Sequence, residues 1–521
     1  MDSWKPTRRQ VVGGAMGLAA YAVASTATAP GASAALLLPG NDFVASYEAA
    51  WQVVDTTVHD NELGQLAWGS SYTLLSLVRM YQATGNALYL DRFVEQADAV
   101  WAKTDEARGV TDGQGRSGPV WRAGGSYAAA AAVVADVNGK ALFEIRSPDP
   151  GASGATITVG SITGGSFSLT LSHPSYSPST VTLTGVTLDP ASASSIENKV
   201  AGAYHLPETG DPNKRLWTVK RLGGSVDAVP VAGTTSLEQR YSAFSGHTGQ
   251  IAYPIAMFAR LVLRGDLASA QGVPLKSVAI DYLARVRRAV AFHDPEWRFA
   301  TLSNGHVGGD YAWPYGAPVP FDGLVQPLNL SHAMGQLLAE LYRIDRTPAF
   351  RPRINAMVRT FRVCATEVGT AWKWPYWPTH SELYNGYAAV SGRSEYTTAY
   401  PATRHIEDIS HGAISVEFLA AAARAGTEAG ALDTSRLVAT YLNHVKAGTS
   451  TAYLRVDGTT PATESQAAQA GRWLSLAQWG STIVGHVEAV YRAMSLAPAS
   501  PSHLSGIAYV AWARNQGWLR D

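Results

Sequence analysis

Histidine, amide and carboxylate side chains recur at a spacing of three or four residues in three segments of the sequence. In chain order these are His247 and Gln250; Asn329, His332 and Gln336; and Asp408 and His411, with Glu407 adjacent. Residues three or four apart share one face of a helix. Imidazoles exchange protons near neutral pH, and amides stabilise developing negative charge by hydrogen bonding. The segments therefore predict one acid–base site, provided that the elements carrying them converge on one cavity.

Part of this pattern also has a structural explanation. Asn329 and Asp408 each precede a run rich in Ala and Leu, where an Asn or Asp side chain commonly caps the first turn of a helix. An acidic pair such as Glu407 and Asp408 also complements the helix dipole. His411 has no such structural explanation, so we take it as the first candidate for catalysis.

A long connection between Trp372 and Arg404 has no helical or strand periodicity and is rich in aromatic residues. Loops of this length are usually functional or disordered, and the aromatic content argues against disorder. We expect this connection to form a lid whose rings stack on a substrate. We expect the same role for the loop around Trp313. The candidate side chains of the long connection are Trp374, Tyr376, Tyr396, Tyr400 and Arg404.

The elements that must position these groups are predicted to be helices. Apolar residues recur at intervals of three and four over residues 41–125 and 240–520, most clearly over 72–81. Five stretches are interpreted as a helix, a turn and a second helix: 71–101, 249–292, 330–361, 414–445 and 482–512. Together with a helix near 42–57 they predict a mainly α fold, an α/α toroid of about six helical hairpins around one cavity. An open solenoid is the alternative.

Alternating apolar and polar residues at 155–159, 166–171 and 180–183 instead predict β-strands separated by Gly, Pro and Ser turns. The predicted organisation is therefore a helical catalytic domain over 35–130 and 236–521, with a small β-rich module inserted at 131–235. This module could bind glycan, but without a distinctive motif we favour a packing role.

The N-terminal segment indicates export. Arg8 and Arg9 precede a short apolar stretch and the small residues Ala32 and Ala34, so residues 1–34 are interpreted as a removable twin-arginine signal. The predicted location is secreted or extracytoplasmic, with no membrane association after signal removal. Lys plus Arg and Asp plus Glu both number 41, so no nucleic-acid partner is expected. Cys364 is the sole cysteine, which excludes a disulfide within the chain.

The run from Met80 to Asn86, followed by Tyr89 and Leu90, resembles hairpins of α/α-toroid carbohydrate enzymes. The segment 407–412, preceded by Trp374-Pro375-Tyr376, is similar to segments of secreted uronate-specific polysaccharide lyases and glucuronyl C5-epimerases. The resemblance covers most of the helical part and none of the β module. It implies a lyase that cleaves an acidic glycan by β-elimination, with a polysaccharide or oligosaccharide partner. It also implies an Asn/His pair and a Tyr at the site, which map to Asn329, His411 and a lid tyrosine.

Three alternatives stay open at this point. A C5-epimerase would use the same groups, and a glycoside hydrolase would need two carboxyl groups from among Glu407, Asp408, Asp310 and Asp112. A glycan-binding protein without catalysis is the third. The spacing of His405, Asp408 and His411 could bind a cation, but without a paired-Cys or HExxH pattern no metal is predicted. No phosphate-binding glycine loop occurs between a strand and a helix, so no cofactor is expected.

Overall fold

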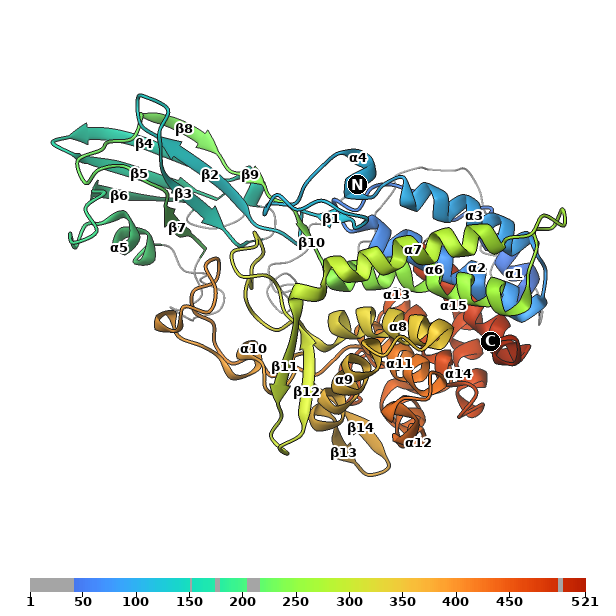
Figure 1. The fold of residues 1–521 in the computed structure, drawn as a ribbon. Helices are drawn as coiled ribbons and strands as arrows, with labels where there is room; N and C mark the ends of the chain where they lie inside the picture. The colour runs from blue at the N-terminus through green and yellow to red at the C-terminus, as the bar shows by residue number, and fades with distance from the viewer. Residues whose placement is uncertain (1–41, 150–151, 174–178, 204–215, 495–499) are drawn as a thin grey trace, which may run out of the picture.

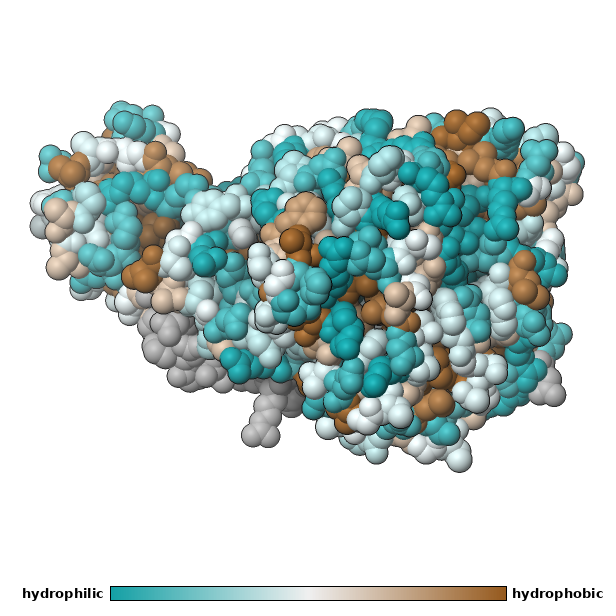
Figure 2. All heavy atoms as spheres, turned by 60° about the horizontal axis from the view of Figure 1, so that its bottom comes forward, coloured by the Kyte–Doolittle hydropathy of each residue, from teal (hydrophilic) through white to brown (hydrophobic). Residues whose placement is uncertain are grey.

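The structure is a computed structural model that describes residues 42–149, 152–173, 179–203, 216–494 and 500–521. The predicted export signal at 1–34 lies outside these residues. A helical body carries a smaller lobe of strands that projects from one end (Figure 1). On the face drawn in Figure 2, hydrophilic residues are interspersed with small apolar patches over both parts. No helix in the described part of the chain is long and apolar enough to span a bilayer.

In the described part of the chain, ten α-helices of nine residues or more form the body. They are α1 (Phe43–Trp51), α2 (Ser71–Thr84), α3 (Leu88–Trp101), α6 (Ser245–Gly265), α7 (Lys276–Phe292), α8 (Leu328–Asp345), α9 (Phe350–Cys364), α11 (Ile409–Arg424), α14 (Thr482–Ala493) and α15 (Pro501–Arg514). Shorter α-helices are α4 (Asp105–Arg108), α5 (Ile196–Ala201), α10 (Glu382–Asn385), α12 (Thr434–Thr440) and α13 (Glu464–Ala467). Segments Leu66–Ser70 and Tyr441–Val445 are π-helical, and Ala468–Leu476 is a 3-10 helix.

Local sequence signals explain several helix ends. The Asp42 and Asp408 side chains cap α1 and α11 by accepting backbone N–H groups of the first turn. α2 ends at Gly85, whose φ of 73° is a left-handed conformation that glycine adopts without strain. The predicted helix at 72–81 is confirmed as part of α2.

The helices of the body pack on one another in sequence around a shared hydrophobic core. α2 packs against α15 and α6, α6 against α8, and α8 against α11. At the crossing of α6 and α8, Gly249 approaches so closely that an added Cβ would lie 2.4 Å from the Met334 nitrogen. This glycine therefore allows the two helices that carry Gln250 and Gln336 to meet.

The lobe consists of two antiparallel four-stranded sheets. Its strands are β2 (Ala130–Ala135), β3 (Ala141–Ser147), β4 (Thr156–Thr163), β5 (Ser166–Ser172), β6 (Thr180–Val186), β7 (Thr218–Arg221), β8 (Gly233–Ser236) and β9 (Glu238–Gln239). The strand orders are β7-β3-β2-β9 and β6-β5-β4-β8. Phe143 of one sheet stacks on Phe167 of the other at 6.0 Å between ring centroids, so the sheets share an apolar interior. The strands predicted near 155–159, 166–171 and 180–183 are confirmed, whereas the predicted domain boundaries remain a prediction.

Three two-stranded sheets complete the fold. They are β1 (Arg122–Ala123) with β10 (Ser242–Ala243), β11 (Trp297–Thr301) with β12 (Val307–Tyr311), and β13 (Thr366–Val368) with β14 (Ala371–Lys373). The first pair lies where the chain leaves the body for the lobe and returns. Ion pairs from Glu395 of the body to Arg146 at 2.8 Å and to Lys220 at 3.1 Å also join lobe and body.

The predicted mainly α-helical toroid is wrong. The structure is 46% helical and 18% strand, and its described residues form five sheets, a mixed content in which no toroid of about six hairpins is shown. One departure is the irregular second half of the predicted hairpin at 414–445, which is present as α11 followed by the short α12 and the π-helix Tyr441–Val445, with α12 packed against β14. The segment Trp297–Thr301 is another, since its alternating large side chains form a strand within the stretch assigned to helices.

Buried charged groups occupy the part of the body towards the C-terminal ends of α2, α8 and α11. Glu417 accepts hydrogen bonds from Arg79 at 2.8 Å, Tyr253 at 2.5 Å and Tyr509 at 2.7 Å. These residues come from α11, α2, α6 and α15, so one carboxylate joins four helices. The Arg79 side chain is fully buried, and its guanidinium also lies over the Trp512 ring at 4.5 Å.

Candidate functional site

The strongest candidate site is the corner formed by Glu407, Asp408 and His411 at the start of α11. Asp408 Oδ1 accepts the backbone N–H groups of Ser410 at 2.8 Å and His411 at 2.9 Å. This cap fixes the carboxylate so that Oδ2 lies 2.6 Å from His411 Nδ1. Among the described residues, no hydrogen bond engages His411 Nε2, and 13% of the side chain is exposed. Nε2 is therefore the nitrogen that can exchange a proton with a ligand.

The electrostatic surroundings shift the pKa values of Glu407, Asp408 and His411 in different directions. Burial opposes the charged imidazolium, but the adjacent Asp408 carboxylate, its hydrogen bond and Glu407 outweigh burial and raise the pKa of His411. Burial would also raise the pKa of Asp408, yet its interactions with His411 lower it. Glu407 is fully buried, and loss of hydration raises its pKa to about 8. At neutral pH the corner therefore combines a charged Asp408 with a protonated Glu407.

Backbone pairing holds this corner. The Glu407 N–H donates to the Trp374 carbonyl at 3.1 Å, and the Tyr376 N–H donates to the His405 carbonyl at 3.0 Å. The Leu328 N–H at the start of α8 donates to the Tyr376 carbonyl at 3.1 Å. The aromatic connection is therefore fixed between the N-terminal ends of α8 and α11.

Tyr376 forms an aromatic wall beside the corner. Its ring stacks on His405 with centroids 4.8 Å apart and lies 5.4 Å from the His411 ring. Burial, reinforced by Glu407 and Asp408, raises the pKa of the phenol well above its ordinary value, so it stays protonated. Burial also lowers the pKa of His405 to about 4, which keeps that imidazole neutral.

Two arginines border the corner. Arg472 donates from Nη2 to the Ser410 carbonyl at 3.1 Å and hydroxyl at 2.9 Å, and its guanidinium lies 4.8 Å from the Tyr72 ring centroid. Arg455 donates from Nη1 to the Ile406 carbonyl at 2.7 Å. These groups supply positive charge next to the His411 imidazole, suited to an anionic ligand.

The amide side chains of α6 and α8 meet in a neighbouring position. Gln336 Nε2 donates to Gln250 Oε1 at 3.1 Å, and both side chains are buried. Asn329 is 1% exposed, and its Oδ1 has no hydrogen-bond partner among the residues that the structure describes. It belongs to the first turn of α8, whose first N–H bonds to Tyr376, so Asn329 is near the wall rather than capping the helix.

The other two histidines lie in separate apolar surroundings. His332 Nδ1 is 2.9 Å from Ser415 Oγ and the ring stacks on Phe418 at 4.7 Å, while burial lowers its pKa to about 3. His247 Nδ1 is 3.1 Å from Asn61 Nδ2, and burial likewise lowers its pKa to about 3. Both imidazoles are neutral, and no contact within the described residues joins either one to His411.

Several lid candidates pack into the protein interior. Trp374 is fully buried against Phe361 and Trp473, and Trp313 is 1% exposed. Tyr396 lies under Arg146 of the lobe at 4.6 Å rather than beside His411. Tyr400 packs edge-on against Phe321 at 5.1 Å, and the exposed Arg404 lies over Tyr384 at 5.2 Å.

Sequence reasoning missed Tyr72, Arg455 and Arg472 as neighbours of the corner. Tyr72 lies two residues after Trp68-Gly69-Ser70, a small-residue turn before an apolar run, and this motif could have indicated it. Arg472 stands in an Ala/Leu segment without a motif, and only the packing of Ala468–Leu476 against α11 brings it to Ser410. No comparable local signal marks Arg455.

The three residues of the corner could also hold a cation. One donor atom from each of Glu407, Asp408 and His411 lies within 4.8 Å of the others. Occupation would require His411 Nδ1 to exchange its hydrogen bond with Asp408 for the cation. The expectation of a metal-free and cofactor-free protein therefore remains a prediction.

Comparisons with known proteins identify no relative: no family model, no curated protein and no solved structure matches this chain.

Proposed function

We propose that this protein is a secreted polysaccharide lyase that cleaves an acidic, uronate-containing glycan by β-elimination at the His411 corner. The observation that carries the proposal is the 2.6 Å contact between Asp408 and His411 Nδ1, which orients the imidazole and leaves Nε2 without a hydrogen-bond partner among the described residues. Tyr376 and two arginines adjoin this imidazole. This set supplies a base, a proton donor and positive charge.

His411, in the neutral form that it adopts above its raised pKa, is the base of the proposed reaction. Its Nε2 takes the proton from C5 of the uronate, the C5–H electrons form a C4–C5 double bond, and the C4–O bond breaks. The Tyr376 phenol, which burial keeps protonated, gives its proton to the departing oxygen. Both bonds break within one site, so no cofactor is needed to balance the step.

Charge neutralisation is the second requirement. Removing the C5 proton places negative charge on the carboxylate, and fixed cations lower the energy of that state. Arg472 and Arg455 border the corner and carry donors that can face an anion. Arg472 N–H groups are held in place by Ser410, which favours a preorganised site.

The carboxyl geometry gives less support to hydrolysis. Glycosidases place two carboxyl groups about 5–5.5 Å or about 6.5–9.5 Å apart on either side of the scissile bond. Glu407 and Asp408 instead both approach His411 Nδ1, at 3.6 Å and 2.6 Å, and Glu407 is fully buried. A C5-epimerase would use the same base and cations, so the product distinguishes it from a lyase.

The test uses a panel of uronate polymers and measures the ultraviolet absorbance of the unsaturated uronate. We expect His411→Gln to reduce turnover by about a thousandfold or more, since it removes the base. His306→Gln, at an exposed position in the β11–β12 turn, is the matched control and should keep full activity. New reducing ends without absorbance would instead identify a hydrolase. Deuterium uptake from D2O without cleavage would identify an epimerase, and equal rates for both variants would refute the role of His411.

A further inference from the structure

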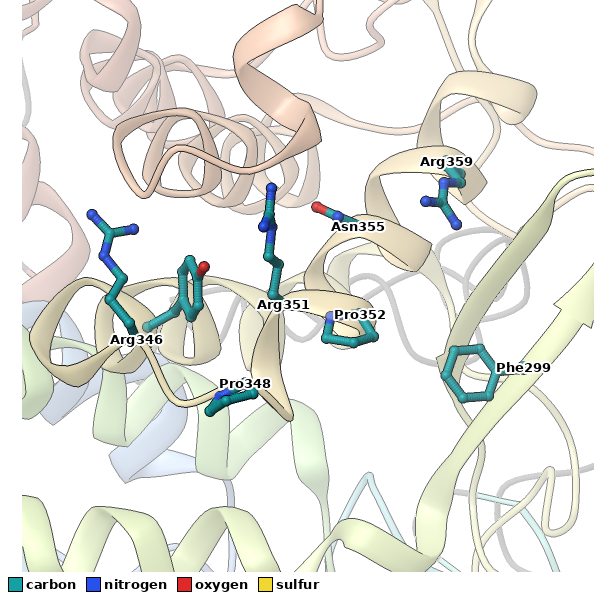
Figure 3. Close-up of a pocket in the computed structure, with 8 residues that line it drawn as sticks. Phe299, Arg346, Pro348, Arg351, Pro352, Asn355 and Arg359 are labelled. Atoms are coloured by element: carbon teal, nitrogen blue, oxygen red, sulfur yellow. The ribbon is translucent and has the colours of Figure 1, made fainter.

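A hollow of about 520 Å³ lies at the junction of α8, α9 and β11, where no sequence motif predicted a site. It is lined by Phe299, Tyr342, Arg346, Pro348, Arg351, Pro352, Asn355 and Arg359. No acidic side chain is among these lining residues, so three guanidinium groups face one space. Arg346 and Arg351 extend to the same side, and Arg351 stands between Arg346 and Asn355 (Figure 3).

Two of the three guanidinium groups have no carboxylate partner among the described residues. Arg346 donates to the Ala425 carbonyl at 2.5 Å and lies over the Tyr342 ring at 5.0 Å, but forms no ion pair there. Arg351 is exposed and forms neither a hydrogen bond nor an ion pair within the described chain. Arg359 is bonded to Glu428, which neutralises its charge. The hollow therefore holds a net positive charge that the fold itself does not use.

Asn355 gives the hollow a buried and directed hydrogen-bond donor. The residue is only 9% exposed, and its Oδ1 accepts the Glu428 N–H at 3.0 Å. Because the oxygen is engaged, the amide orientation is fixed and the Nδ2 group, for which no partner occurs in the described chain, remains available to a ligand.

The remaining walls are apolar and flat. Phe299 is 58% exposed on β11, and Tyr342, Pro348 and Pro352 provide the other faces. Rings of this kind pack against the apolar faces of a sugar ring, while guanidinium groups bind a planar carboxylate through two parallel hydrogen bonds. A volume of about 520 Å³ is also within the range of small-ligand pockets.

From these features, we propose that the hollow is a second glycan site that binds a uronate unit, with Arg346 and Arg351 on its carboxylate and Phe299 along its ring. It lies at the C-terminal end of α8, whereas the His411 corner adjoins the N-terminal end. The 18 residues of α8 separate these ends by about 27 Å. The hollow therefore cannot be part of the catalytic corner. It acts as an additional binding site for the same acidic polymer. The choice of ligand class rests on the proposed function.

The test measures binding by calorimetry at low salt, using the full-length His411→Gln protein so that no turnover occurs. The probes are an oligogalacturonate, a neutral glucan oligosaccharide of equal length, and inorganic phosphate. Arg351→Glu should weaken oligogalacturonate binding by about tenfold or more, and Phe299→Ala should weaken it by several fold. Lys276→Glu, which makes the same charge change at an exposed position of α7, should leave it unchanged.

Each other outcome overturns the inference. Equal weakening by Lys276→Glu would show a general charge effect, and equal binding of the neutral glucan would remove the role of the arginines. Phosphate binding that Phe299→Ala does not affect, without oligogalacturonate binding, would identify a simple anion site. Turnover of a short uronate substrate by the Arg351→Glu protein tests the proposed function separately, because this site is remote from His411.

Discussion

At the residue scale, the two carboxylate oxygens of Asp408 have different roles. Oδ1 caps α11 through two backbone N–H groups, and Oδ2 contacts His411 Nδ1. The sequence indicated both possibilities from the spacing of Asp408 and His411, but the division between oxygens depends on the extended backbone before the helix. That conformation is set by pairing with residues 454–456, which are distant in sequence.

Asp408→Asn separates these roles, because Asn caps a helix almost as well as Asp but carries no charge. We expect the pKa of His411 to fall, as measured by NMR titration of its ring proton. The raised pKa of His411 stabilises the fold below about pH 6.5 and is lost as pH rises through the folded value. The lowered pKa of Asp408 stabilises it above about pH 4. The variant should therefore lose about 1–3 kcal/mol near pH 5.5 and less above pH 8.

The matched control is Asp433→Asn at the exposed N-cap of α12, where no histidine is bonded to the carboxylate. Its unfolding free energy should differ from that of the parent protein by a few tenths of a kcal/mol at either pH. An unchanged His411 titration in Asp408→Asn would contradict the assigned coupling.

At the element scale, the crossing of α6 and α8 determines which amides meet. Helical periodicity predicted both elements and placed Gln250 and Gln336 on polar stripes. It could not predict their contact, since a contact depends on the distance between helix axes. Gly249 sets that distance through its approach to the Ala333 and Met334 backbone.

Gly249→Ala is expected to reduce the unfolding free energy by about 2–3 kcal/mol, because its new Cβ would lie 2.4 Å from the Met334 nitrogen. Urea unfolding measures this loss. Gly485→Ala in α14, where an added Cβ meets nothing within 4 Å, should instead stabilise by up to about 1 kcal/mol through helix propensity. Equal effects of the two substitutions would show that the crossing is not tightly packed.

At the scale of the whole molecule, charged side chains contribute to the centre of the helical body. Arg79 and Glu417 are 338 positions apart in sequence and form a buried ion pair at 2.8 Å. No local pattern reveals such a pair, because each residue resembles an ordinary charged position on a helix. Contacts between residues distant in sequence also explain why the predicted toroid was wrong. Periodicity describes each helix alone, whereas the architecture depends on which distant helices and strands pack together.

Arg79→Met should lower the unfolding free energy by about 3–5 kcal/mol, because it leaves the Glu417 carboxylate buried without its cation. The double variant Arg79→Met with Glu417→Leu removes both charges and should recover part of this loss. Arg285→Met breaks an exposed pair with Asp281 and should cost less than about 1 kcal/mol. Thermal or urea unfolding of the four proteins checks this order.

The short ladder between β1 and β10 pairs Arg122 with Ala243 and Ala123 with Ser242. The polypeptide therefore departs towards the lobe and comes back within the width of a single strand pair, and the Glu395 ion pairs hold the lobe against the body from outside this junction. Protein engineers can treat the ladder as a splice junction: it keeps Ala123 and Ser242 side by side, so a shorter connection grafted beyond the residues that pack on the body leaves the spacing of the helices unchanged.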